Sequence, residues 1–141
     1  MAVLFENHSE TVALKHVRKL VDLQDEWGLL EMGFRHTTGK SVPKRQDKAI
    51  FYLKQVADLD GKLSAIACFN IGAIYLRAES AKATPWFKVS AEKGYGAAQY
   101  NYGLSLVEGW NGEVDETAGL EWIERAAMEG VYEAKKYTAT T

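Results

Sequence analysis

A segment of this sequence recurs at intervals of 34 to 36 residues, which are the distances from Tyr52 to Trp86 and from Trp86 to Trp122. The segment Ala98–Gly103 matches Ala67–Gly72 in register, and each is followed by a stretch that runs from a tryptophan to a glycine. This period is typical of helix-turn-helix repeats, each of which buries its apolar face against the next. An array of such repeats usually presents a binding surface and not an active site.

The spacing inside the repeats locates a deletion. In the outer two repeats, 16 residues separate the glycine of the first helix from the small residue of the second helix, as from Gly103 to Gly119. In the middle repeat, 11 residues separate Gly72 from Ala83. We therefore expect the middle repeat to lack five residues in the loop between its helices. A turn is expected at Leu59–Ser64.

The recurring residues resemble a known family. The pattern A-x-Y-N-x-G, a G-x-x-G-x-V-D loop, W-I/F-x-K/R-A-A and a closing E-x-G are similar to the Sel-one-like repeat (SLR) family, a relative of the tetratricopeptide repeats. The resemblance covers residues 28–138 and implies an all-α fold, a right-handed α-solenoid of about three helix-turn-helix repeats. For function it implies a scaffold that hosts many partners.

We expect a single domain over residues 1–141, because this length with 47% hydrophobic residues suffices for one sizeable core. Its expected parts are an N-terminal cap (1–26), a degenerate repeat (28–61), two further repeats (62–94 and 95–130) and a partial fourth repeat (131–141).

Periodicity and helix breakers predict eight helices or fewer and no strand. The expected ranges are 10–24, 27–38, 46–59, 63–77, 80–93, 96–108, 115–129 and 131–137. Pro43 is expected in a loop and Pro85 in the first turn of a helix, where proline is tolerated. Asp115 is the predicted N-cap of the helix that Gly130 closes as its C′ residue.

Small residues predict how the helices pack. Gly72 and Gly103 would let a second helix approach closely, while the aromatic residues Tyr52, Trp86 and Trp122 would fill the wider spaces. The segment Thr11–Val21 places its valines and leucine near one face, as expected for a capping helix.

Charge and composition exclude several classes of function. With 17 basic and 19 acidic residues, the net charge of −2 gives no field that would draw the chain onto nucleic acid or an acidic membrane. Ala2–Phe5 is too short for a signal peptide, and no stretch approaches the length of a membrane span. The single Cys68 cannot form an internal disulfide. We therefore expect a cytoplasmic protein.

Two short segments resemble catalytic motifs. Gly39-Lys40-Ser41 ends like a phosphate-binding loop, but the first glycine of that motif and the preceding strand are missing. Ser41 and Lys44 match the S-x-x-K motif of penicillin-binding enzymes, although Pro43 disfavours the helix on which that motif depends. A hydrolase of lactam or peptidoglycan-like substrates using Ser41 and Lys44 remains the alternative function.

The remaining reactive side chains predict no catalytic residue, metal or cofactor. Cys68 lies between Ala67 and Phe69, where a small buried thiol is expected. The three histidines lack the i,i+4 spacing of zinc ligands, and His36 occupies a repeat position that favours packing.

The predicted function is therefore binding of a protein or peptide on the concave side of the solenoid, which the first helices line. The candidate contact residues are Arg35, Asn70, Arg77, Gln99, Asn101, Ser105, Glu108 and Trp110. Asn70 and Asn101 would either bind the backbone of a peptide or serve the packing of the repeat. Trp110 would either contact the partner or fold back onto helix 96–108.

The resemblance suggests two biological settings, a bacterial cytoplasmic adaptor or the immunity protein that neutralises a secreted toxin. An apolar edge around Tyr132 and Tyr137 would also allow a homodimer. The sequence does not decide among these partners.

Overall fold

The computed structural model describes the backbone of residues 2–140 and the side chains of residues 8–140. Over this range the chain forms eight α-helices and no strand. They are α1 (Ala2–Asp22), α2 (Glu26–Thr38), α3 (Gln46–Leu59), α4 (Ser64–Ala78), α5 (Ser80–Glu92), α6 (Gly96–Glu108), α7 (Glu116–Met128) and α8 (Tyr132–Thr140). The six helices from α2 to α7 begin and end within one residue of the predicted positions.

The ends of α1 differ from the prediction. The helix begins at Ala2 and not at residue 10, because no glycine or proline interrupts the chain before Glu10. It ends at Asp22, two residues earlier than expected, since Gln24 adopts a left-handed conformation with φ of 55°. The side chains of Ala2–Phe5, considered above for an export signal, lie outside the described residues. Between residues 2 and 140, no helix is long and apolar enough to cross a membrane.

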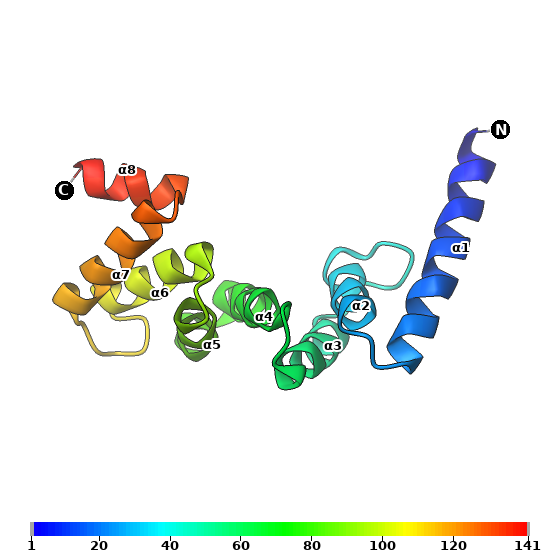
Figure 1. Cartoon of the computed structure of the whole chain (residues 1–141), viewed down its shortest axis with the longest axis horizontal. Coiled ribbons are helices and arrows are strands. Elements are labelled where there is room, and N and C mark those ends of the chain that lie inside the picture. The colour runs from blue at the N-terminus through cyan, green and yellow to red at the C-terminus, as the bar shows by residue number, and fades with distance from the viewer. Residues whose placement is uncertain (1, 141) are drawn as a thin grey trace. The chain divides into compact units, whose positions relative to one another are not determined.

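The helices form two compact units, the first extending to Ser64 and the second beginning at Ala65. In each unit helices that are neighbours in sequence also pack together (Figure 1): α1 on α2 and α2 on α3 in the first, α5 on α6, α6 on α7 and α7 on α8 in the second. The division into a cap and repeats proposed from the sequence remains a prediction.

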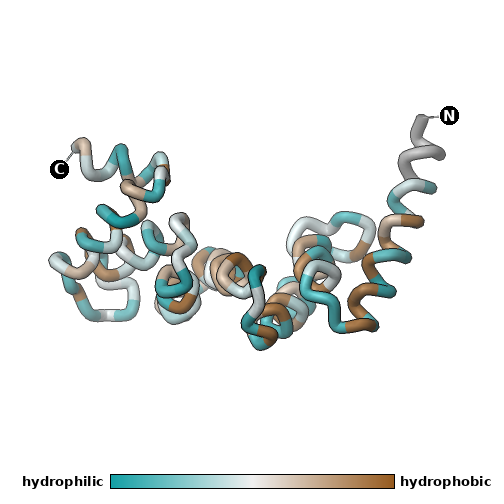
Figure 2. Tube along the Cα trace, viewed as in Figure 1, coloured by the Kyte–Doolittle hydropathy of each residue, from teal (hydrophilic) through white to brown (hydrophobic). Residues whose placement is uncertain are grey.

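In the first unit the core lies between α1, α2 and α3. Hydrophobic and hydrophilic residues alternate along the described part of α1 (Figure 2). Leu14 and Val17 of this helix are buried with Met32 of α2. A Cβ atom on Gly28 would lie 2.4 Å from the Cβ atom of Leu20, so the two helices touch here through a position where only glycine fits.

In the second unit the glycines of the repeat set the closest helix contacts. A Cβ atom on Gly72 would lie 2.7 Å from the ring of Phe87. A Cβ atom on Gly103 would lie 2.6 Å from Ile123 and 2.7 Å from the carbonyl oxygen of Gly119. The predicted role of Gly72 and Gly103 in close packing is confirmed.

The packing of the aromatic residues differs from the prediction. Tyr52, Trp86 and Trp122 are only partly buried, whereas the residue after each of them is completely buried. These fully buried residues are Leu53, Phe87 and Ile123. The aromatic side chains therefore lie at the edge of the core, where Tyr102 contacts Trp122 edge-on with ring centroids 5.5 Å apart.

The connection in the middle repeat is short, as predicted. Only Glu79 separates α4 from α5, compared with seven residues, 39–45, between α2 and α3. The loop of the middle repeat is thus six residues shorter, while α4 extends one residue further past its glycine than α2 does. The net difference is the five missing residues.

The expected place of Pro85 was wrong, because it is the sixth residue of α5 and lies inside the helix. Proline has no N–H to donate to the carbonyl of Ala81, which is an exposed residue.

The predicted ends of α7 are confirmed. Asp115 caps the helix by accepting a hydrogen bond from the backbone N–H of Ala118 at 3.1 Å. Gly130 follows the last helical turn with a φ of 94°, a left-handed conformation that glycine adopts without strain.

Candidate partner-binding surface

The repeat glycines give a common reference for comparing side chains on the first helices. Gly33 of α2, Gly72 of α4 and Gly103 of α6 each face the second helix of their own repeat. A residue at the same distance from each glycine therefore occupies the same repeat position. Its exposure in all three repeats shows whether the position faces the core or the solvent.

Two repeat positions that supplied candidate residues face the core in every repeat. Two residues after the glycine, the exposed fraction is 4% for Arg35, 8% for Ile74 and 0% for Ser105. Four residues before the glycine, Leu29, Cys68 and Gln99 are all buried. The premise that Arg35, Gln99 and Ser105 are not needed for packing was wrong. The expected burial of Cys68 is confirmed.

Arg35 forms ion pairs inside the first unit. Its Nη1 atom donates to Oε2 of Glu10 on α1 at 3.1 Å, and its Nε atom lies 3.2 Å from Oε1 of Glu31. The hydroxyl of Ser41 donates to the same Glu10 oxygen at 2.9 Å. Hydrogen bonds from Ser41 and then Arg35 lower the pKa of Glu10. These contacts tie α1, α2 and the following loop together, which is a structural role.

Gln99 and Ser105 each donate a hydrogen bond within the second unit, while the Oε1 atom of Gln99 is buried without a partner. The Gln99 side chain donates to the carbonyl of Ala91 at 3.5 Å, and the Ser105 hydroxyl donates to the carbonyl of Tyr102 at 2.6 Å. Neither side chain is positioned to contact a partner on the surface.

Four candidate residues do reach the surface of the second unit, at two other repeat positions. Asn70 and Asn101 lie two residues before the glycine and are half-buried, while Arg77 and Glu108 lie five residues after it and are exposed. Residues seven apart on a helix lie on one face. Each first helix of this unit therefore presents an asparagine and a charged residue on the same face.

The asparagine amides leave hydrogen-bonding capacity unused. The Nδ2 atom of Asn70 is buried without a hydrogen-bond partner. Asn101, at the equivalent position, makes no hydrogen bond with any residue that the structure describes. An unpaired buried donor costs about 1–3 kcal/mol. Because the Nδ2 atom of Asn70 is buried, a partner would reach it only if the side chain rotated toward the surface.

Trp110 lies beside this face, in the loop after α6. Its indole Nε1 donates to the carboxylate of Glu108 at 2.7 Å. Its ring contacts Phe87 of α5 edge-on, with centroids 6.3 Å apart, and the residue is half-buried. Trp110 thus packs partly against the second helix of the preceding repeat, while part of its surface remains open.

Ser41 and Lys44 are not arranged for catalysis. The Ser41 hydroxyl donates to Glu10, and Lys44 makes no ion pair with a residue in the described part of the chain. The segment between Gly39 and Arg45 is a loop, so the two side chains do not share the helical face that the S-x-x-K motif requires. Gly39 ends α2 with a φ of 80°, which accounts for the glycine without a phosphate.

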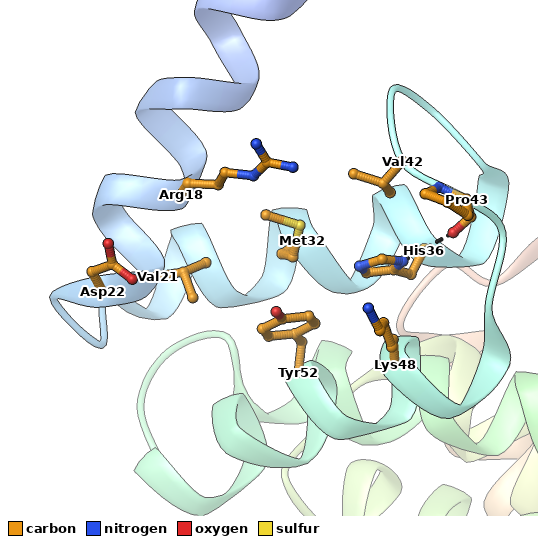
Figure 3. A pocket seen from close by; sticks show the side chains of 9 residues that line it. All are labelled: Arg18, Val21, Asp22, Met32, His36, Val42, Pro43, Lys48 and Tyr52. Carbon is orange, nitrogen blue, oxygen red and sulfur yellow. Dashed lines mark hydrogen bonds between the residues drawn. The ribbon is translucent and has the colours of Figure 1, made fainter.

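The first unit contains a pocket that no sequence pattern predicts (Figure 3). Arg18, His36, Lys48 and Tyr52 contribute its polar groups. These residues come from three helices and follow no motif. Only His36 stands out in the sequence, because a histidine replaces the tyrosine and leucine found at its position in the other repeats.

Comparisons with known proteins agree with this architecture. The Sel1 repeat profile matches residues 28–61 and 96–131. A Sel1 repeat protein from Oxalobacter formigenes has the same fold, with a TM-score of 0.77 and 24% sequence identity over 92% of this chain and 98% of that one. A protective antigen present in uropathogenic Escherichia coli strains, which displays an SLR fold, is 32% identical with a TM-score of 0.77.

The second match covers 86% of this chain but only 27% of the antigen, so this chain corresponds to about a quarter of that protein. No curated protein shows a significant sequence match. Sel1 repeat proteins are generally protein-interaction modules. Two family repeats, eight described helices and the shared fold confirm the all-α repeat architecture, and the chain is a member of the Sel1-like repeat family.

Proposed function

We propose that this chain is a non-catalytic interaction module that holds a protein partner on the α4–α6 face of its second unit. The face is defined by Asn70, Arg77, Asn101 and Glu108, with Trp110 at its edge. The observation that supports the proposal is the recurrence of an asparagine two residues before the glycine, at Asn70 and Asn101, with no hydrogen bond from either amide to the described part of the chain. Arg35, Gln99 and Ser105 are left out of the contact surface because they are buried.

The chemistry of the face suits an extended segment of the partner. An asparagine amide offers both a donor and an acceptor, as a backbone peptide group does. Two such amides on successive repeats would pair with peptide groups along one strand of the partner. Arg77 and Glu108 carry opposite charges at equivalent positions, so they favour a partner segment with complementary charges over one of a single sign.

A capture experiment with matched variants tests the proposal. Wild-type protein, an Asn101→Ala, Trp110→Ala variant and a Lys88→Ala, Glu124→Ala control are immobilised and exposed to lysate of the native organism. Lys88 and Glu124 are exposed residues at equivalent positions on the second helices. We expect a protein that the wild type and the control retain and the first variant loses. Equal retention by all three would place the partner elsewhere and reject the proposed face.

A narrower form of this function is neutralisation of a bacterial toxin by a cytoplasmic immunity protein. The net charge of −2 supports binding of a neutral or basic protein. Co-expression with toxins encoded beside this chain tests the idea. Restored growth would support it, and continued killing by every such toxin would reject it.

Self-association is the remaining proposal for a partner. Met128 and Tyr132 are exposed large apolar residues near the C-terminal end of the described chain, whereas Tyr137 packs against the core of the second unit. Pairing of two copies would cover Met128 and Tyr132. Light scattering tests it, because a dimer mass that Tyr132→Lys reduces supports pairing and a monomer mass at all concentrations rejects it.

A further inference from the structure

The first unit contains a pocket that the proposed interaction face does not use. It has a volume of about 380 Å³ and is bounded by α1, α2, the 39–45 loop and α3 (Figure 3). Small-molecule sites typically have volumes of roughly 300–1,000 Å³. The size is therefore that of a site for a small ligand.

One part of the pocket wall is apolar. Met32 is buried in the core cluster of the unit, and Val21, Val42 and Tyr52 pack against it while partly exposed. These four side chains line the hollow. A ligand would therefore need an apolar portion to gain from contact with them.

The pocket also contains two cations without counter-ions. Arg18 of α1 and Lys48 of α3 both line it, and neither forms an ion pair with a residue in the described part of the chain. Asp22 lies four residues after Arg18, at a spacing that allows an ion pair, but none forms. Figure 3 shows Asp22 at the end of the pocket near the α1–α2 turn, with the Arg18 guanidinium directed away from it.

His36 adds a polar atom whose orientation is fixed. Its Nδ1 atom lies 3.0 Å from the carbonyl oxygen of Pro43, which can only accept a hydrogen bond, so Nδ1 carries the proton. The imidazole also stacks on Tyr52, with ring centroids 5.7 Å apart and planes 5° from parallel. Its Nε2 atom therefore points away from Pro43, toward the interior of the pocket (Figure 3).

We propose that this pocket binds a small organic acid, with its carboxylate between Arg18 and Lys48 and its apolar stem against Met32 and Tyr52. Two cations against the single carboxylate of Asp22 favour an anionic ligand. A phosphate ion fits less well, because its additional oxygens would face Met32 and Val42, which donate no hydrogen bonds. This site lies in the first unit and does not depend on the protein partner proposed above.

NMR titration of the full chain with hexanoate tests the proposal. The ligand is small, so we expect a dissociation constant on the order of 1 mM. Saturable shifts should appear at residues 18–22, 32–36, 42–43 and 48–52. Hexanamide has the same stem without the charge, and acetate has the charge without the stem. Both should bind more weakly than hexanoate. Equal binding of either, or no saturable shift at these residues with hexanoate, would overturn the proposal.

A pair of double variants separates the site from general charge effects. Arg18→Gln, Lys48→Gln removes both pocket cations, and Lys19→Gln, Lys62→Gln removes two exposed cations of the same unit that do not line the pocket. All four side chains are exposed, so both variants should keep the dispersed spectrum of the folded chain. We expect the pocket variant to bind hexanoate about fivefold more weakly, because each exposed cation contributes one weak ion pair, and the control to bind it unchanged. Wild-type affinity in the pocket variant would reject the site.

Discussion

The helix pairs α2–α3 and α6–α7 have loops of equal length, 39–45 and 109–115, but they are stabilised by different contacts. In α6–α7 the backbones themselves approach, since Cβ atoms on Gly103 or Gly119 would lie 2.7 Å from the carbonyl oxygen of the other glycine. In α2–α3 a Cβ atom on the corresponding Gly33 would lie 2.8 Å from the buried Leu53 side chain and 3.5 Å from the nearest backbone atom, the carbonyl oxygen of Ala49.

The same two repeats differ at the position two residues after the glycine. Arg35 fills this buried position in the first unit and pairs with Glu10 and Glu31, while Ser105 fills it in the second and bonds only to its own helix. One repeat sequence can thus be stabilised either by close backbone packing or by ion pairs that recruit the neighbouring helix. Each contrast predicts a difference between matched variants.

The largest effect is expected for Gly103→Ala. Its Cβ atom would meet backbone that cannot move independently, so we expect a loss of about 2–3 kcal/mol in the free energy of unfolding. Gly33→Ala would displace the Leu53 side chain and no backbone atom, so it should cost less than Gly103→Ala, and the better helix propensity of alanine offsets part of that cost by up to about 1 kcal/mol. Urea unfolding measures both. Equal losses would show that the backbone contact does not distinguish the two repeats.

The next effect is expected for Arg35→Met. This change leaves the Glu31 carboxylate without its cation and leaves Glu10 only the exposed Lys40, 3.6 Å away; because both carboxylates are partly exposed, we expect a loss of about 1–2 kcal/mol. Ser105→Ala removes one hydrogen bond within a helix and should cost less than about 1 kcal/mol. Thermal unfolding followed by circular dichroism compares them. A larger loss for Ser105→Ala would contradict the assigned roles.

A smaller effect is expected at the start of the second helix in each pair. Asp115 caps α7, whereas Arg45 at the start of α3 makes no capping hydrogen bond. Asp115→Ala should therefore lower the free energy of unfolding by about 1 kcal/mol. Arg45→Ala should change it less, since its ion pair with Asp47 is exposed. Urea midpoints that shift equally for the two variants would argue against the capping assignment.

The smallest effect concerns pH. Hydrogen bonds from Ser41 and Arg35 hold the pKa of Glu10 below its ordinary value of 4.5. A carboxylate whose pKa is lower in the folded than in the unfolded chain stabilises the fold when the pH is above the unfolded-state pKa. This contribution disappears as the pH falls through the folded-state pKa. Glu10→Gln should therefore be less stable than wild type at neutral pH, and the difference should shrink below pH 4.5. Melting temperatures over this range measure it, with Glu124→Gln as the exposed control.

Much of the fold could be predicted because the signals for it are local. Glycines after α2 and α6, the Asp115 cap and the repeat period fix where the helices begin and end. The register of side-chain packing was harder, since Trp86 and Phe87 are both large and only the structure shows which one is completely buried.

The candidate surface could be predicted only in part. The recurrence of Asn70 and Asn101 two residues before the glycine is visible in the sequence, and their role in binding stays a prediction. The burial of Arg35 could not be predicted, because Glu10 lies 25 residues earlier in the sequence and on a helix outside the repeats. The pocket around Arg18 and Lys48 was missed for the same reason, since its charges come from separate helices.

Site-specific photo-crosslinking in cells of the native organism tests the central claim, that the α4–α6 face holds a protein partner. A photoreactive residue replaces Arg77, Glu108, Lys88 or Glu124, four exposed positions on α4, α6, α5 and α7. The account predicts one crosslinked partner at Arg77 and Glu108 and none at Lys88 or Glu124. A partner that crosslinks from Lys88 or Glu124 and not from Arg77 or Glu108 would contradict it.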